Sequence, residues 1–178
     1  MANRAYLVGL NENFFEDDDV NLHPLIDRSY ALPLLWFSLF EPDDLRMYSH
    51  VPIMLTSRDK ALANIDRRAA ALKAFLGPQA APIVDHWRTF IDENAYANYL
   101  MNPMELVQMQ DEEGEFLRDL RQWIAEFESI ADGSATTRTL GILHQAHDGL
   151  MEYPYTGDPL HLCGHSFERP LPWERKRA

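Results

Sequence analysis

The chain of 178 residues has the length of one domain, and with 46% hydrophobic and 11% aromatic residues it has ample apolar surface for a folded core. Its 28 acidic and 16 basic side chains give a formal net charge of −12; four of the basic groups and one acidic group lie in the last ten residues, so the first 168 carry −15. Such a charge repels phosphate backbones and anionic lipid headgroups, which argues against direct binding of nucleic acid or of a membrane surface.

The first part of the chain predicts two strands and a buried helix. Residues 5–10 are rich in Tyr, Leu and Val and precede a polar turn, which predicts a strand. Residues 16–19, Glu-Asp-Asp-Asp, are too charged to be buried and indicate a solvated loop. Pro33 suits the first turn of an apolar helix that ends at Glu41, and residues 53–55 predict a short buried strand.

Apolar residues recur at helical spacing in three later stretches. The first, residues 57–76, begins at Ser57, whose hydroxyl can cap the helix, and ends before a Gly-Pro pair. The second extends over residues 82–100 and the third over residues 116–131. A short apolar segment near Pro103 separates them, and Gly114 predicts a break before the third helix.

Residues 140–150 suit a helix, with a strand over residues 136–143 as the alternative. Pro and Gly become frequent after Met151, so we expect residues 153–178 to form a tail that is packed on the body or partly disordered. Residues 1–152 are then one compact globular domain. The predicted fold class is α+β and helix-dominated, with a small sheet of a few short strands packed against three or more long helices.

Several features predict a cytoplasmic protein. The N-terminus lacks the long apolar segment of a secretory signal. The most apolar stretch, residues 31–40, is too short for the roughly 20 residues that span a bilayer. Cys163 is the only cysteine, so no internal disulfide can form, which fits a reducing compartment.

A metal site is the main chemical alternative. His161, Cys163 and His165 alternate, so an extended segment would place the three side chains on one face. His144 and His147, three residues apart on a possible helix, could supply further ligands. The pattern matches none of the usual zinc spacings, so an ordinary group of histidines is favoured and no cofactor is expected.

Two other patterns carry possible chemistry. Cys163 between histidines could be a nucleophile, but no family signature surrounds it and a small buried residue is favoured. The segment Thr56-Ser57-Arg58 could hold an anion at a helix start, but without a Gly-rich loop before it, Ser57 as an ordinary cap is favoured. No nucleotide-binding, Gly-x-Ser-x-Gly or His-Glu-x-x-His pattern occurs, so the sequence favours a protein that is not an enzyme.

The opening Met-Ala-Asn-Arg-Ala-Tyr-Leu, followed by an acidic loop and by Tyr-Ala-Leu-Pro-Leu-Leu-Trp at residues 30–36, resembles the start of a group of uncharacterised bacterial proteins. The resemblance covers roughly the first forty residues and carries over no catalytic residue. As a small acidic protein, the chain is also similar in type to the immunity proteins that neutralise bacterial toxins.

Two acidic runs are the candidate partner-binding residues: Asp17, Asp18 and Asp19 in the first, and Asp111, Glu112 and Glu113 in the second. Neither run follows the ligand order of a calcium-binding EF-hand. Dense acidic patches can steer a protein toward a basic partner and raise the rate of association. The hypothesis is therefore an inhibitor of immunity or antitoxin type that occludes a toxin whose active-site surface is basic.

Overall fold

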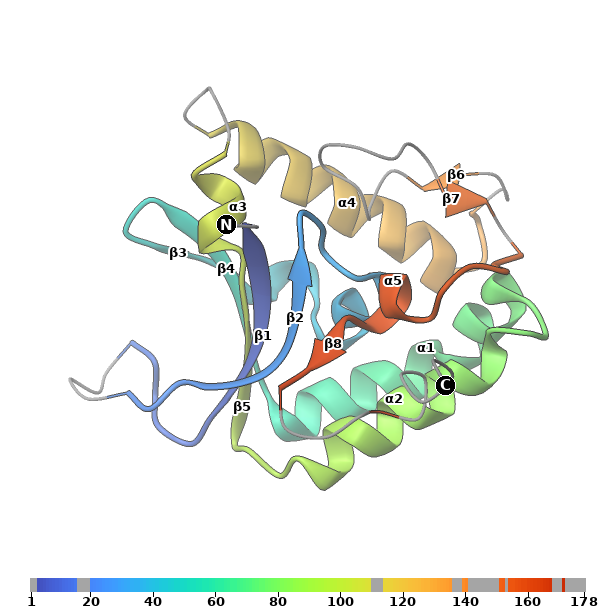
Figure 1. Ribbon diagram of the computed structural model, residues 1–178, viewed down its shortest axis with the longest axis horizontal. Helices are drawn as coiled ribbons and strands as arrows, with labels where there is room; N and C mark the ends of the chain where they lie inside the picture. Colours follow the sequence, from blue (N-terminus) through green and yellow to red (C-terminus); the bar gives the residue numbers. More distant parts are fainter. Residues whose placement is uncertain are drawn as a thin grey trace.

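The fold is α+β, and a six-stranded antiparallel sheet packs against helices on one of its faces (Figure 1). This computed structural model describes residues 3–15, 20–109, 114–135, 139–140, 151–152, 154–167 and 171. In chain order the elements are β1 (Arg4–Leu10), β2 (His23–Ser29), the 3-10 helices η1 (Leu34–Leu39) and η2 (Pro42–Asp44), β3 (Leu45–Tyr48), β4 (Val51–Ser57), α1 (Arg58–Leu76), α2 (Ala81–Glu93), β5 (Asn98–Asn102), α3 (Met104–Val107), α4 (Glu115–Ala131), β6 (Thr139–Leu140), β7 (Met151–Glu152), α5 (Leu160–Cys163) and β8 (His165–Ser166).

The strands of the sheet follow the order β3-β4-β5-β1-β2-β8, and every neighbouring pair is antiparallel. The N-terminal strand β1 therefore lies inside the sheet, between β2 and β5. The strand β3 is one edge and the two-residue strand β8 is the other. β6 and β7 form a separate two-stranded pair.

One face of the sheet belongs to the main core. Side chains alternate between the two faces of a strand, so Leu7 of β1, Met54 of β4 and Met101 of β5 point to the same side. There they pack with the buried faces of α1, α2 and α4 and with η1, all of whose residues are buried. The largest fully buried side chains include Trp36 and Trp87.

The other face carries a second, smaller apolar cluster, which we call the open sheet face. Its members are Val8, Leu10, Ile53 and Leu100, with the half-buried Tyr6, Phe14, Val20, Val51 and Leu55 around them. Among the described residues, no helical side chain belongs to this cluster. In the part of the chain that the structure describes, helices therefore cover one side of the sheet.

Several elements agree with the sequence-based prediction. The expected strands over residues 5–10 and 53–55 are β1 and β4, and the helices expected over residues 57–76 and 116–131 are α1 and α4. Ser57 caps α1, because its hydroxyl accepts a hydrogen bond from the amide of Lys60 (3.4 Å). The segment after Pro33 is buried as predicted, but it forms a 3-10 helix rather than an α-helix.

Two parts of the prediction are wrong. The helix expected over residues 82–100 ends at Glu93, and residues 98–102 form β5 in the middle of the sheet. Tyr99, Leu100 and Met101 are buried on both faces of the sheet, and such a continuous apolar run has no period that separates strand from helix. The sheet is also larger than the few short strands expected, since β2, β3 and β8 were not foreseen.

The described part of the C-terminal tail packs against the body. The amide of Tyr155 donates to the carbonyl of Leu76 at the end of α1 (2.8 Å), and the indole of Trp36 donates to the carbonyl of Cys163 (2.8 Å). β8 then pairs with β2. Of residues 136–150, where the sequence left helix and strand open, residues 139–140 form the strand β6, and residues 136–138 and 141–150 lie outside the described residues.

In the part of the chain that the structure describes, no helix combines the length and apolarity that crossing a bilayer requires.

Candidate protein-binding site

The six acidic residues expected to bind a partner lie outside the described residues, but described residues lie close to both ends of each run. The first run joins Phe15 to Val20, which packs on the open sheet face. The second run follows Met109 and precedes Gly114, immediately before α4. The first acidic run is thus joined directly to described residues on both sides, and the second is joined directly to Gly114 but to Met109 only through Gln110.

An aromatic group connects the first of these positions to the sheet edge. The ring of Phe14 lies 5.3 Å from that of Phe15 and 4.9 Å from that of Tyr48, both in edge-on geometry. Phe15 is 48% exposed and Tyr48 is 46% exposed, so each offers an aromatic surface to solvent. Aromatic side chains are enriched at protein interfaces, and those that become fully desolvated at the centre of an interface contribute much of its binding energy.

A groove lies between the edge strand β3 and α4, and we call it the β3–α4 groove. Its larger part, about 700 Å³, is lined by Pro42, Asp43, Leu45, Arg46, Met47, Leu117, Arg121, Ile124 and Ala125. A smaller part of about 210 Å³ continues past Met47 and Leu117, which line both, and includes Gly114 at the end of the second acidic run. In Figure 1, β3 and the start of α4 lie on the same side of the molecule.

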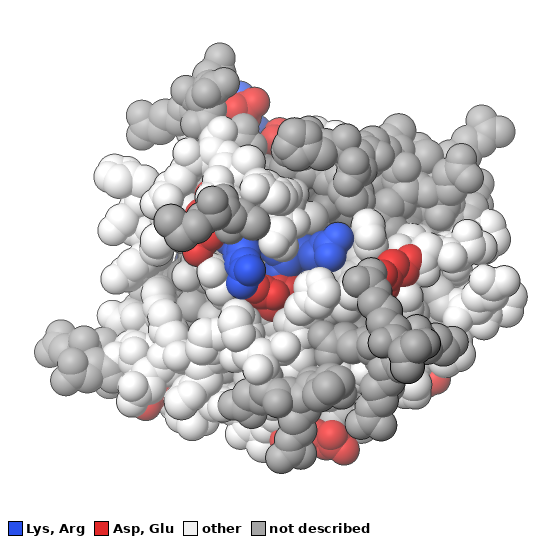
Figure 2. All heavy atoms as spheres, in the orientation of Figure 1, with Lys and Arg blue, Asp and Glu red and all other residues white. Residues whose placement is uncertain are grey.

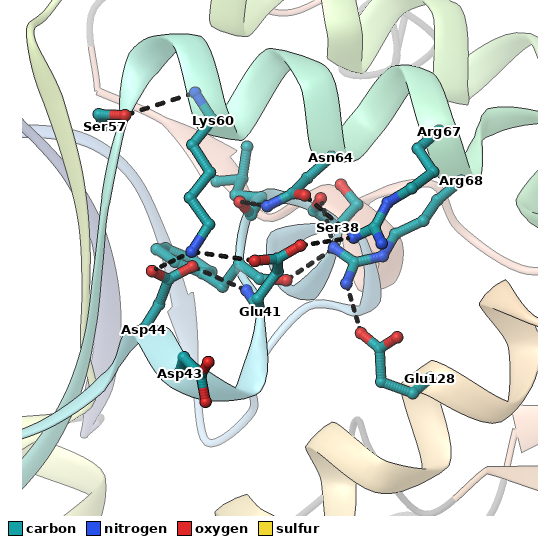
Figure 3. Close-up of polar contacts among 12 residues, drawn as sticks. Ser38, Glu41, Asp43, Asp44, Ser57, Lys60, Asn64, Arg67, Arg68 and Glu128 are labelled. Atoms are coloured by element: carbon teal, nitrogen blue, oxygen red, sulfur yellow. Dashed lines mark hydrogen bonds and ion pairs between the residues drawn. The ribbon is translucent and has the colours of Figure 1, made fainter.

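A network of hydrogen bonds and ion pairs holds together the elements that line the β3–α4 groove (Figure 3). Arg68 of α1 is 1% exposed, and its guanidinium donates to the carbonyls of Ser38 (3.1 Å) and Phe40 (2.6 Å) and to the carboxylate of Glu128 on α4. The hydroxyl of Ser38 in turn accepts from the indole of Trp87 (3.0 Å). One buried cation therefore holds η1, α1 and α4 together.

The second half of this network fixes the start of β3. Glu41 and Asp44 bracket η2 as a capping box, in which the amide of Glu41 donates to Asp44 Oδ2 (2.8 Å). Lys60 Nζ donates to both carboxylates (3.0 and 2.8 Å), and Arg67 pairs with Glu41 (2.8 Å). β3 leaves η2 directly, so these contacts determine where the groove wall begins.

The charge states in the network suit a structural role. The hydrogen bond from Lys60 lowers the pKa of the Glu41 carboxyl below its ordinary value of 4.5. Burial lowers the pKa of the Lys60 ammonium, but hydrogen bonds to Asp44 and Glu41 outweigh burial and leave that pKa raised. Burial lowers the pKa of Arg68. Glu41 is therefore ionised at neutral pH and engaged by cations, the opposite of a carboxyl held ready to donate a proton.

Figure 2 shows that Lys and Arg side chains gather at one place on the face in view, bordered by acidic side chains. At the start of β1, Arg4 forms an ion pair with Asp27 (2.6 Å), and its amide donates to Glu105 (2.9 Å). Glu105 also accepts from the hydroxyl of Tyr6 (2.8 Å), and burial followed by this bond raises the pKa of Tyr6. The Arg4 guanidinium is thus already matched by a carboxylate.

The metal alternative finds no geometric support in the described residues. His161 and Cys163 lie in the helical turn α5, and Gly164 follows with a φ of +87°, so the extended segment that would align them with His165 does not form. Cys163 is buried, whereas His165 is exposed. No group of three potential ligands occurs among the described residues, and His144 and His147 lie outside them.

Sequence reasoning did not find the β3–α4 groove. Its lining comes from η2, β3 and α4, which are far apart in sequence, and β3 itself has no strong strand pattern. The available signal was the pair Met47-Tyr48, two large apolar residues in an otherwise polar turn region.

Comparisons of the chain with protein-family models, with curated proteins and with solved structures find no match.

Proposed function

We propose that this protein is a non-enzymatic inhibitor of immunity type, which binds a protein partner with a basic surface and occludes it. The partner is a bacterial toxin whose substrate groove is basic. The observation that carries the proposal is the placement of exposed aromatic side chains next to acidic sequence: Phe15, 48% exposed, directly precedes the run 16–19 and contacts Phe14 beside Tyr48.

This combination supplies the two components of a tight complex. Exposed aromatic groups that become desolvated on binding provide affinity, and charges around them mainly accelerate the encounter. The formal charge of −15 over residues 1–168 provides a field that attracts a basic partner from a distance.

The test is to co-express the protein with the product of the neighbouring gene. We expect a stable complex and protection of the host cell from that product. Protection without a complex, or a complex that leaves the toxin active, would contradict occlusion.

Charge-neutralising variants then test which residues are used. One variant replaces Asp17, Asp18 and Asp19 together by Asn. The other replaces Asp111 by Asn and both Glu112 and Glu113 by Gln. A matched control neutralises Asp59, Asp85 and Glu93, three exposed acids on α1 and α2, and changes the net charge by the same amount.

At least one of the two candidate triples should slow association by about tenfold, while the control triple has a smaller effect. Equal association rates for all three variants would show that only the total charge matters. No change in any of them would remove electrostatic steering from the proposal.

A further inference from the structure

The edge strand β3 presents backbone hydrogen-bonding groups to the β3–α4 groove. The amide of Arg58 donates to the carbonyl of Ala97 (2.9 Å), which continues the ladder between β4 and β5. Backbone groups of successive residues in a strand point to alternate sides, so the even-numbered residues of β4 bond toward β5. The odd-numbered residues Val51 and Ile53 must then bond toward β3.

The register of the β3–β4 hairpin shows which residues of β3 bond to β4 and which face outward. Val51 is opposite Tyr48 and Ile53 is opposite Arg46, so Arg46 and Tyr48 direct their N–H and C=O groups to β4. Met47 therefore directs its N–H and C=O away from the sheet, whereas the N–H of Leu45 donates to the carbonyl of Pro42 and its C=O accepts from the guanidinium of Arg46 (3.0 Å). Pro52, which has no N–H, lies opposite Met47 at a position where β3 requires no donor from it.

Side chains at the same edge favour an extended occupant. Leu45 and Met47 line the β3–α4 groove, and Met47 is 48% exposed. A strand added to β3 would place every second side chain over this groove, toward Leu117 and Ile124 of α4. Its other side chains would lie beside Tyr48 on the opposite side of the edge.

The groove also carries an exposed cation. Arg121 of α4 is exposed, and none of the described residues forms an ion pair with it. Arg46, the other Arg of the groove, has its guanidinium bonded to the carbonyl of Leu45 (3.0 Å) and to that of Asp43. A carboxylate on the occupant would complement Arg121.

We propose that β3 binds an extended segment of the partner protein by β-strand addition, with alternate apolar side chains in the β3–α4 groove and an Asp or Glu on Arg121. The inference deepens the proposed function and rests on it. It assigns the occupant by chemistry, namely a strand with apolar residues at every second position and one acidic residue among them.

The probe is a display library of heptapeptides with Val, Ile or Leu at alternate positions and all amino acids at the others. Selection on the wild-type protein should enrich binders with Asp or Glu. Met47→Pro removes the outward N–H but no bond to β4, and edge strands accept proline at such positions, so the fold is retained. We expect Met47→Pro to bind the selected peptides about tenfold more weakly.

Met47→Ala is the matched control, because it shortens the side chain and keeps the N–H; it should bind more tightly than Met47→Pro. Arg121→Glu should abolish the enrichment of acidic peptides and favour Lys or Arg instead. Amide exchange gives a direct readout: a bound peptide should slow exchange at Met47, whereas the amides of Leu45, Arg46 and Tyr48 are hydrogen-bonded with or without it.

No enrichment on the wild-type protein, equal binding by Met47→Pro, or unchanged exchange at Met47 would each overturn strand addition. These results are separable from the proposed function, which is judged by toxin protection. If Met47→Pro protects cells as well as the wild-type protein does, occlusion stands and β3 is not its contact.

Discussion

At the scale of single residues, Arg68 shows how one charge can organise several elements. Its guanidinium is buried, bonded to two main-chain carbonyls and to Glu128, and lies 5.5 Å from the ring centre of Phe127. A buried cation is retained only where hydrogen bonds replace the water it has lost. Removing it would leave those carbonyls without their donor inside the core.

Arg68→Met should therefore lower the free energy of unfolding by about 3 kcal/mol. Its neighbour is the control: Arg67 is 57% exposed at its side chain, and Arg67→Met should cost less than about 1 kcal/mol. Urea denaturation of both variants measures the difference. Equal losses would mean that the burial of Arg68 has no energetic consequence.

Trp123 tests the packing of α4. It is 8% exposed and meets the ring of Phe116 edge-on at 5.7 Å. Trp123→Ala should cost about 3–5 kcal/mol, because a large cavity opens in the core. A loss below about 1 kcal/mol would show that this face of α4 is not packed as described.

Sequence could predict the role of Trp123 but not that of Arg68. The helical stripe that contains Trp123 is local, so its spacing alone indicates a buried face. Arg68 lies on a stripe of α1 that also buries Ile65 and Leu72, and the carbonyls that accept from it belong to η1. Such long-range partners have no local signature.

At the scale of elements, the contrast between local signals and long-range contacts explains which predicted boundaries of helices and strands were wrong. α1 has a Ser cap at its start and Gly77, with a φ of +82°, at its end, and both are readable from the sequence. β5 has neither signal, and it is a strand because β1 and β4 lie on either side of it. β3 forms through its pairing with β4, across a two-residue turn in which Ser49 has a φ of +54°.

Because of Glu41, which precedes η2, the free energy of unfolding should fall at acid pH. Glu41 has a lowered pKa, so its ionised form stabilises the fold above pH 4.5, and this contribution is lost as the pH falls through the lowered value. Glu41→Gln should be less stable than the wild-type protein at pH 7, and the difference should shrink toward pH 3. Denaturation at several pH values measures it.

Asp43→Asn is the control for this experiment, because Asp43 lies two residues after Glu41, is exposed and is outside the ion pairs of the described residues. Its stability should follow that of the wild-type protein at each pH. A Glu41→Gln variant that remains equally destabilised at pH 3 would show that shape rather than charge is lost.

At the scale of the whole molecule, the tail is part of the structure in its described residues. Leu171 is buried in the main core, which the sequence of a Pro-rich tail did not reveal, because tertiary contact rather than local pattern decides burial.

Deleting residues 169–178 should lower the free energy of unfolding by about 2–3 kcal/mol through loss of the Leu171 side chain. Deleting 174–178, which removes charged residues and one alanine, should cost much less.

The net charge predicts the kinetics of binding. Raising the salt concentration from about 0.05 to 0.5 M should slow association with the toxin by about tenfold or more, because screening shortens the reach of the field. The dissociation rate should change less, since contacts already formed depend less on that field. Stopped-flow mixing measures both rates, and an association rate independent of salt would contradict steering.

The place of β1 in the sheet has a consequence for synthesis on the ribosome. The strand leaves the exit tunnel before the strands that pair with it: its neighbour β5 is 88 residues or more behind its last residue, and β8, which covers β2, ends only at Ser166. A nascent chain can form the β1–β2 hairpin early, yet both of its edges remain unpaired until much later. Exposed strand edges are where chains associate wrongly, so this interval is when the protein depends most on chaperones.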